Sequence, residues 1–292
     1  MYNDILAKIE SMTSGFSKGQ KLIAAYILGN FDNAAYMTAS KLGDEAGVSE
    51  STVVRFANEL GLSGYPELQR EIRESVRKRL TSVQRISVAN ERLSGSDIPS
   101  AVLSADIENI RYTMENLDRG AFDRAVSAIL GAKSISVIGM RSSSSLAEFM
   151  YHYLSLVFEN VRLVRTTSGS EIFEQLMHLG EEDVLIAVSF PRYSARMVNA
   201  VSFAAERGAR VIALTDSKLS PIAQGAYATL EARSDKASFV DSLAAPLSVA
   251  NALIAAVGMK KREEVTSTFA ELEKIWDRYH VYDPHAGDGE DD

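Results

Sequence analysis

Short apolar runs alternate with helix-like segments over residues 134–232, and this alternation limits the fold of the chain more than any other feature. The runs are SISVIG (134–139), VRLVR (161–165), DVLIAVS (183–189), ARVIALT (209–215) and AYATLEA (226–232). Segments with helical periodicity separate the first four runs, at 143–158, 170–179 and 194–207. Apolar strands joined through helices indicate a parallel sheet that is covered on both faces. We therefore predict an α/β domain over residues 98–282, with a five-stranded parallel sheet sandwiched between helices.

Residues 1–80 show no strand pattern and are predicted to form an all-α domain. Within them, TASKLGDEAGVSESTVVRFANEL (38–60) has the spacing of two helices joined by a tight turn. Gly47 lies at the turn, where a positive φ is cheap only for glycine, and Ser49 can cap the second helix. This arrangement is typical of a helix-turn-helix, whose second helix enters the major groove of DNA.

The second helix offers a polar face suited to reading bases. Arg55 can donate two hydrogen bonds to guanine, and Ser51 and Thr52 can bond to bases or phosphates. An ordinary helical hairpin with a solvated face is the alternative, but this helix is rich in small polar groups and lacks a Glu/Lys ladder. The predicted DNA-binding residues are Thr38, Ser49, Glu50, Ser51, Thr52, Arg55 and Tyr65.

The charge distribution is compatible with a double-stranded DNA partner. The net charge of the 292 residues is −8, but residues 1–80 carry ten Lys/Arg and ten Asp/Glu and are neutral. A basic stretch, Arg70–Arg79, follows the second helix, and either phosphate contacts or ion pairs with Glu71 and Glu74 would explain it. We predict a linker over 81–97 and an acidic tail over 283–292, DGEDD being its last five residues.

Composition excludes several classes of protein. Zero cysteines rule out disulfides and thiol catalysis, and four scattered histidines make a metal site improbable. We find no apolar run of about 18 residues and no secretory leader pattern, so we expect a cytoplasmic protein without a membrane partner. We expect no cofactor.

Two predicted strand ends continue into serine- and arginine-containing loops that each open a helix. The first is Gly139-Met140-Arg141-Ser142-Ser143-Ser144-Ser145, and the second is Ser189-Phe190-Pro191-Arg192-Tyr193-Ser194. Backbone N–H groups at a helix N-terminus attract anions, and ligands of doubly wound sheets bind at the carboxyl ends of the strands. The alternative is that the serines are only helix caps. The predicted ligand-binding residues are Gly139, Arg141, Ser142, Ser143, Ser144, Ser189, Arg192 and Ser194.

The chain resembles the RpiR/MurR-type bacterial transcriptional regulators over nearly its whole length. The N-terminal resemblance rests on VSESTVVRFANELGLSGYPELQ, and the C-terminal one, to the sugar isomerase (SIS) domain, on SISVIGMRSSSS, VLIAVSFPRYS, AERGARVIALTDSKLSPIA and FVDSLAAPLSVANALI. The resemblance implies a DNA-binding regulator, either a repressor or an activator, whose SIS domain binds a phosphosugar or a related anionic carbohydrate metabolite. Of the two signs of regulation, we favour repression. It also implies a homo-oligomer, either a dimer or a tetramer.

The chain departs from the family pattern where arginine replaces glycine. The usual first loop is Gly-x-Gly-x-Ser, and Arg141 replaces its second glycine. The usual second loop is Ser-x-Ser-Gly-x-Thr, and Arg192 replaces its glycine. We hypothesise that both guanidinium groups converge on a phosphate or a carboxylate, which would also admit a sugar acid or keto acid. The alternative is structural ion pairs, for instance with Glu148 or Glu171, that block the pocket.

An SIS-type isomerase is the competing function, because SIS domains also occur in aldose–ketose isomerases. Its general acid and base would come from Glu148, His152, Glu171 or His178. We find no paired carboxylates that demand catalysis, and therefore expect a regulator that is not an enzyme. A scaffold whose ligand pocket is closed is a third interpretation.

Overall fold

The computed structural model describes residues 5–79, 97–165, 169–235 and 240–282. The chain divides into two compact units, Met1–Ser87 and Val88–Asp292, which we call the helical unit and the α/β unit. Of the predicted linker 81–97 only Asp97 is described, and the predicted tail 283–292 lies outside the described residues. No helix in the described ranges is long and apolar enough to cross a bilayer.

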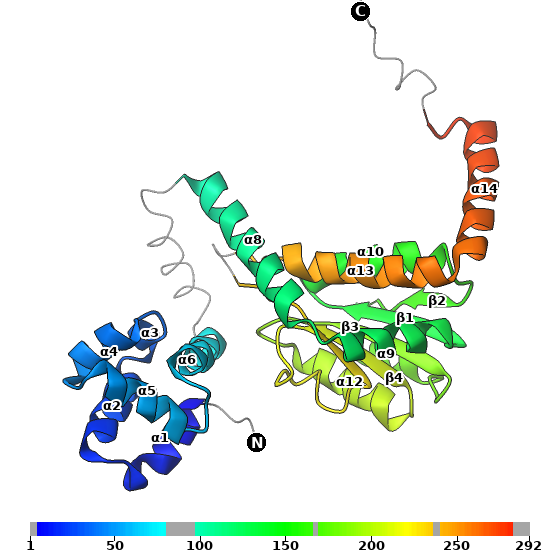
Figure 1. Ribbon diagram of the computed structural model, residues 1–292. Helices are drawn as coiled ribbons and strands as arrows, with labels where there is room; N and C mark the ends of the chain where they lie inside the picture. Colours follow the sequence, from blue (N-terminus) through cyan, green and yellow to red (C-terminus); the bar gives the residue numbers. More distant parts are fainter. Residues whose placement is uncertain (1–4, 80–96, 166–168, 236–239, 283–292) are drawn as a thin grey trace, which may run out of the picture. The chain divides into compact units, whose positions relative to one another are not determined.

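The helical unit contains only helices and turns in its described part, as predicted (Figure 1). One apolar cluster joins its helices, and Phe56 lies fully buried in it with its ring edge-on to Phe16 at 5.2 Å between centroids. The elements are α1 (Ile5–Met12), a 3₁₀ turn η1 (Thr13–Gly15), α2 (Lys18–Gly29), α3 (Phe31–Ala34), α4 (Ala39–Ala46), α5 (Glu50–Glu59) and α6 (Tyr65–Arg79).

Two glycines shape the connection between α4 and α5. Gly47 adopts the predicted left-handed conformation, with φ of 70°. The next residue, Val48, returns its N–H to the Gly43 carbonyl at 2.8 Å, a bond that closes the end of α4. A Cβ on Gly43 would lie 2.8 Å from the Val48 oxygen, so the approach of the two helices needs a residue without a side chain here.

The α/β unit contains the predicted five-stranded parallel sheet. Its strand order is β2-β1-β3-β4-β5, and every neighbouring pair is parallel. The elements are α8 (Ile98–Asn116), α9 (Arg119–Leu130), β1 (Ser134–Gly139), α10 (Ser143–Ser155), β2 (Val161–Leu163), α11 (Gly169–Leu176), β3 (Asp183–Val188), α12 (Ala195–Glu206), β4 (Arg210–Thr215), β5 (Ala228–Glu231), α13 (Ala244–Lys260) and α14 (Arg262–Tyr279).

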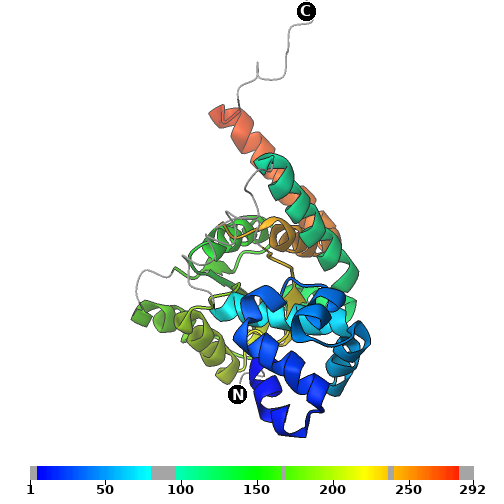
Figure 2. The ribbon, with the colours of Figure 1, turned by 90° about the vertical axis from the view of Figure 1, so that its left-hand side faces the viewer.

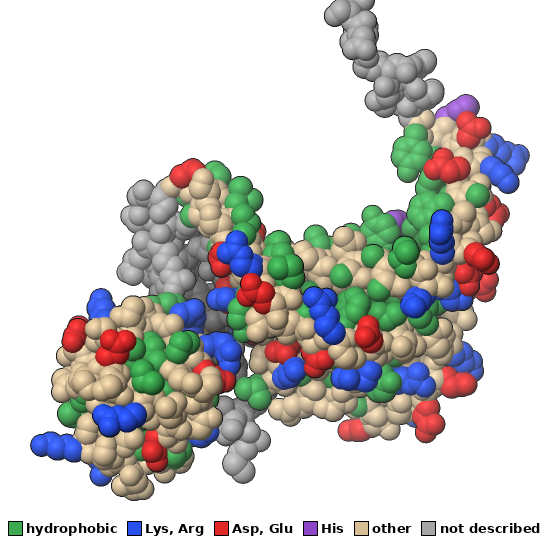
Figure 3. Space-filling view, viewed as in Figure 1, with side chains coloured by type: hydrophobic (Ala, Val, Ile, Leu, Met, Phe, Trp, Pro, Cys, Tyr) green, Lys and Arg blue, Asp and Glu red, His purple; other side chains and the backbone are tan. Residues whose placement is uncertain are grey.

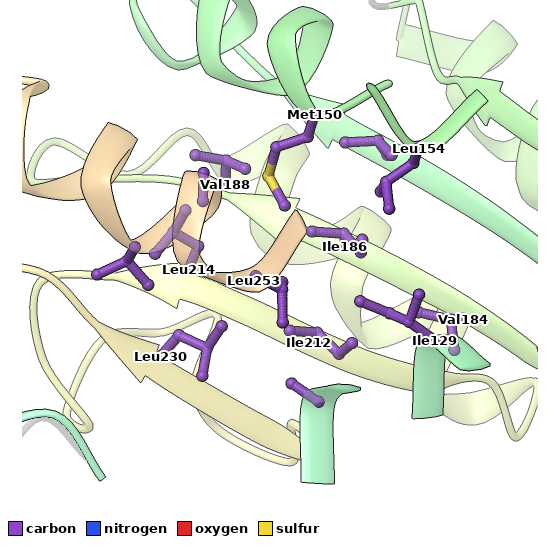
Figure 4. Packing of buried hydrophobic residues seen from close by; sticks show 14 of the residues in the cluster. Ile129, Met150, Leu154, Val184, Ile186, Val188, Ile212, Leu214, Leu230 and Leu253 are labelled. Carbon is purple, nitrogen blue, oxygen red and sulfur yellow. The ribbon is translucent and has the colours of Figure 1, made fainter. Parts of the chain in front are cut away.

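Helices cover both faces of this sheet, which explains why the central strands β1, β3 and β4 are buried along almost their whole length, whereas the edge strands β2 and β5 are only partly buried. On one face, α9, α10 and α13 pack against Ile186, Ile212 and other strand residues, and Met150 and Leu253 point into this core (Figure 4). On the other face, α11 and α12 pack against Leu185 and Val211. Figures 1 and 2 show the two helical layers on opposite sides of the strands. The helices that follow β1 and β3 therefore lie on opposite faces.

Replacing Gly139 by alanine tests the tightest contact in this unit. An added Cβ would lie 2.3 Å from the Ser143 carbonyl oxygen and 2.9 Å from the Ala147 Cβ, so we expect G139A to lower the free energy of unfolding by about 3 kcal/mol. A Cβ added to Gly258, inside α13, would have nothing within 4 Å, and G258A should stabilise by about 0.5–1 kcal/mol. Urea titration followed by circular dichroism measures both; equal effects would contradict the contact.

Candidate functional site

A network of hydroxyl and guanidinium groups covers the exposed face of α5. The Ser49 hydroxyl lies 2.9 Å from those of Ser51 and Thr52, and Arg55 donates to the Ser51 carbonyl at 3.3 Å and to the Thr52 hydroxyl at 3.4 Å. Glu50, Ser51 and Arg55 are exposed, whereas Thr52 is half-buried. The structure thus brings five of the seven predicted DNA-binding residues together at the start of one helix.

The structure contradicts the prediction that the Ser49 side chain caps α5. Ser49 occupies the N-cap position of α5 with extended backbone, but its side chain makes no capping bond to the described helix. Its hydroxyl instead contacts two other side-chain hydroxyls, on Ser51 and Thr52. A capping hydroxyl must point at backbone N–H groups, so Ser49 is oriented toward the polar face of α5 rather than toward the helix axis.

The remaining two predicted DNA-binding residues have structural contacts. Thr38 caps α4 by accepting a bond from the Lys41 N–H at 3.2 Å, and its side chain is exposed. Tyr65 is 6% exposed, its hydroxyl donates to the Met37 carbonyl at 2.6 Å, and burial raises its pKa to about 12. These contacts give Tyr65 a structural role, because its hydroxyl holds the segment that leads into α4.

Side chains at the start of the basic stretch on α6 are paired. Arg70 forms ion pairs with Glu67 at 3.0 Å and with Glu71 at 3.9 Å. Arg73 donates to the Ala35 carbonyl at 3.4 Å and lies over the Tyr36 ring. These contacts favour the structural interpretation of Arg70 and Arg73.

The two predicted ligand loops follow adjacent strands. Gly139, the last residue of β1, is in register with Val188, the last residue of β3. The chain leaves β1 for one face of the sheet and β3 for the other, so the strand order reverses between them. In doubly wound sheets such a switch point opens the crevice in which ligands bind.

Arg141 and Arg192 share an unusual backbone conformation. Their φ angles are 57° and 70°, and His280 is the one further non-glycine residue with positive φ in the described ranges. A left-handed conformation costs an L-residue about 1–2 kcal/mol, and glycine avoids this cost. Arg141 and Arg192 are both exposed. The glycines that the usual loops carry at these positions therefore fit the backbone without cost. Arginine at the same positions pays the conformational cost of a positive φ.

The serines of these loops are not helix caps. Neither Ser142 nor Ser194 makes a side-chain cap bond in the described part of the chain. The Ser142 hydroxyl donates to Asp241 Oδ2 at 2.8 Å, and the Ser144 hydroxyl donates to the Arg141 carbonyl at 2.7 Å. The capping alternative is thus not supported.

Two backbone N–H groups of the first loop are already used within the loop. The Ser143 and Ser144 N–H groups donate to the carbonyls of Met140 and Arg141, at 3.1 and 3.0 Å. Ser143 is buried, whereas Ser142 and Arg141 are exposed. The side chains that this loop presents at the surface include the Ser142 hydroxyl and the Arg141 guanidinium.

The second loop is tied to the end of β4. Tyr193 donates its hydroxyl to Asp216 Oδ1 at 2.5 Å, and the Thr215 hydroxyl donates to the same oxygen. Ser189 is buried, with its N–H bonded to the Leu214 carbonyl, while Ser194 is half-buried. These bonds position the stretch that holds Arg192.

Known families match both units of the chain. Residues 3–79 match the helix-turn-helix domain of the rpiR family, and residues 128–256 match the SIS domain. The sugar isomerase domain of an RpiR transcription factor from Sphaerobacter thermophilus is 32% identical, with a TM-score of 0.59, over 61% of this chain and 99% of that one. The chain belongs to the RpiR family of transcriptional regulators.

Further relatives cover both units. HexR of Escherichia coli K12, a helix-turn-helix transcriptional regulator, is 27% identical over 225 residues, which are 76% of this chain and 75% of HexR. The Vibrio vulnificus NanR protein, solved with ManNAc-6P, has a TM-score of 0.60 at 20% identity, over 94% of this chain and 98% of that one. This RpiR-family chain is thus a DNA-binding regulator with an SIS domain.

Both histidines considered for isomerase chemistry lie away from the ligand loops. His152 is exposed in the last turn of α10, nine residues after the helix begins, or about 13 Å along its axis. His178 is exposed between α11 and β3, at the opposite edge of the sheet. Arg141 forms no ion pair with Glu148 in the described part of the chain.

Sequence reasoning missed Asp241, the partner of Ser142. It lies just before α13 in the segment FVDSLAAPLS, where the polar pair Asp241-Ser242 interrupts an apolar run. That interruption is the signal that could have identified it.

Variants of Arg141 test the strained loop. Because φ is positive there, R141G should be about 1 kcal/mol more stable to unfolding than R141A. The matched pair at Arg111, an exposed residue inside α8, should show the reverse order by about 1 kcal/mol, because glycine disfavours helix. Urea unfolding measures all four variants, and the same order at both positions would refute the strain.

Proposed function

We propose that this RpiR-family regulator senses a phosphosugar or a related anionic carbohydrate metabolite at the ends of β1 and β3. One observation carries the proposal: two arginines with left-handed backbones and a serine hydroxyl that caps no helix occupy the switch point of the sheet. A guanidinium offers a fork of donors matched to phosphate or carboxylate. The NanR protein, which shares the fold, was solved with ManNAc-6P, and this supports a phosphosugar.

We propose that α5 reads the operator through Ser51, Thr52 and Arg55, with Ser49 and Glu50 beside them. Arg55 is exposed and held by Thr52 and Ser51, so part of its rotamer entropy is already lost before DNA binds. Thr38, exposed at the start of α4, is suited to a phosphate contact. The proposal includes regulation by repression. It also includes a cytoplasmic location, because the DNA of a bacterium lies in the cytoplasm.

The α/β unit binds its metabolite without converting it. Isomerisation needs an acid and a base at the sugar carbons, and both candidate histidines lie away from the ligand loops. Glu171, in the first turn of α11, is the candidate carboxylate on the same edge as the loops. Turnover of a bound sugar phosphate, followed by NMR, would contradict this part of the proposal.

The regulator acts as a homodimer or a tetramer through its α/β unit. α8 exposes five large apolar side chains, and α14 has no buried residue although it carries Phe269, Ile275 and Trp276 (Figure 3). A second copy of the chain would remove these apolar surfaces from water. A two-fold dimer would read a palindromic operator with half-sites one or more helical turns apart. The five exposed residues of α8 are Ile98, Leu103, Ile107, Ile110 and Met114.

Arg55 should govern operator specificity. We expect R55A to weaken binding to an operator enriched from random duplex DNA by about 1–3 kcal/mol and to relax the preference at one base pair. R111A, on α8, should leave the affinity unchanged. Gel shift and footprinting measure these effects; an unchanged R55A affinity, or a footprint without two-fold symmetry, would count against the interface.

A screen of metabolites tests the ligand site. Sugar phosphates, amino-sugar phosphates and sugar acids are tested for shifts of the thermal midpoint, and hits are taken to calorimetry and gel shift. We expect R141A and R192A each to lose about 1.5–3 kcal/mol of binding free energy, because each removes charge-assisted hydrogen bonds. Unchanged affinity in both variants would refute convergence of the arginines, and a screen without any shift would favour a closed scaffold.

A further inference from the structure

Helix α8 is fastened to the chain by its polar side. Asp106, Asn109 and Thr113 lie at i, i+3 and i+7, on one face of the helix, and Asn109 and Thr113 are its two buried residues. Each bonds to the stretch of chain between β5 and α13. The Asp106 carboxylate accepts from the Ser242 hydroxyl at 2.6 Å, Asn109 donates to the Asp235 carbonyl at 2.8 Å, and the Thr113 hydroxyl accepts from the Arg233 N–H at 2.9 Å.

The same stretch reaches the proposed ligand loop one residue before Ser242. Asp241 accepts the hydroxyl proton of Ser142 at 2.8 Å. A serine hydroxyl has one proton to donate, so Ser142 can donate to Asp241 or to a ligand oxygen, but not fully to both. Asp241 therefore occupies the donor that an anion bound beside Arg141 would use.

Charge reinforces this competition. A phosphate or carboxylate that accepts from Ser142 would lie within a few ångströms of the Asp241 carboxylate, and like charges about 4 Å apart repel. Ligand and Asp241 thus exclude one another at this hydroxyl. Because Asp241 and Ser242 are consecutive, movement of the first alters the bond of the second to Asp106 on α8.

We propose that an anionic ligand displaces Asp241 from Ser142, and that the Ser242–Asp106 bond passes this displacement to α8. The inference rests on the proposed ligand site. It assigns Asp241 as the residue that connects occupancy of the loop with α8. Along the sequence, α8 is the first described element after the segment 80–96, through which the chain continues from the helical unit. A change in α8 therefore acts on the part of the chain that leads to the DNA-binding helices.

Hydrogen exchange in the ligand-free, full-length protein tests the connection without any ligand. S142A removes the donor to Asp241, and we expect amide exchange in α8 to rise about three- to tenfold, as for loss of one hydrogen bond. S248A is the matched control, because the Ser248 hydroxyl bonds within its own helix to the Ala244 carbonyl. Unchanged exchange in S142A would overturn the proposal.

Binding assays with inorganic phosphate and ManNAc-6P test whether a ligand competes with Asp241 for the Ser142 hydroxyl. D241N should bind phosphate about fivefold more tightly, because it removes the like charge. S242A should bind the probes as the wild type does, yet lose most of the ligand-dependent change in operator affinity, whereas S248A should keep it. Full retention of that change in S242A, or weaker phosphate binding in D241N, would overturn the proposal. If the wild type binds neither probe, the proposed ligand class fails. The hydrogen-exchange experiment on S142A then decides alone whether Ser142 is connected to α8.

Discussion

The contact of Gly139 with the first turn of α10 is the constraint on which the site in the α/β unit depends. A Cβ added to Gly139 would lie 2.3 Å from the Ser143 oxygen, which leaves no room for a side chain between the end of β1 and the helix. The chain must therefore turn sharply over Met140 and Arg141, and Arg141 takes a left-handed conformation. The same turn consumes the N–H groups of Ser143 and Ser144. These two N–H groups are therefore not available to a ligand.

Helix α8 inverts the usual arrangement of an amphipathic helix. Its two buried residues, Asn109 and Thr113, are polar, and its large apolar residues are exposed. Hydrogen bonds to the chain before α13 compensate for burying the polar groups, which would otherwise cost free energy. By contrast, α13 packs apolar side chains into the sheet core. Within one chain, a helix held by a few directional bonds has fewer buried contacts to lose than one held by a core, so it suits an element that responds to a ligand.

The predictions that succeeded were those that depend on periodicity and local conformation. The strands were recognised because short apolar runs alternate with helical segments along the chain, and Gly47 because a tight turn requires positive φ. Periodicity does not show where a side chain points. Ser49 has a capping residue's identity and position but contacts hydroxyls, and Tyr65 donates to Met37, which lies 28 residues earlier. No local pattern encodes such a partner.

The sequence by itself determined the two-part organisation, the parallel sheet, the helix-turn-helix and the loops at the ends of β1 and β3, because these follow from local propensity and from hydrophobic spacing. The family resemblance, too, rested on local motifs. Only the tertiary structure decided that Arg141 and Arg192 adopt strained backbones, that Ser142 donates to Asp241, and that Asp106 meets Ser242. The two hydrogen bonds join residues 99 and 136 positions apart, and their existence depends on how the helices pack on the sheet rather than on any neighbour in the chain.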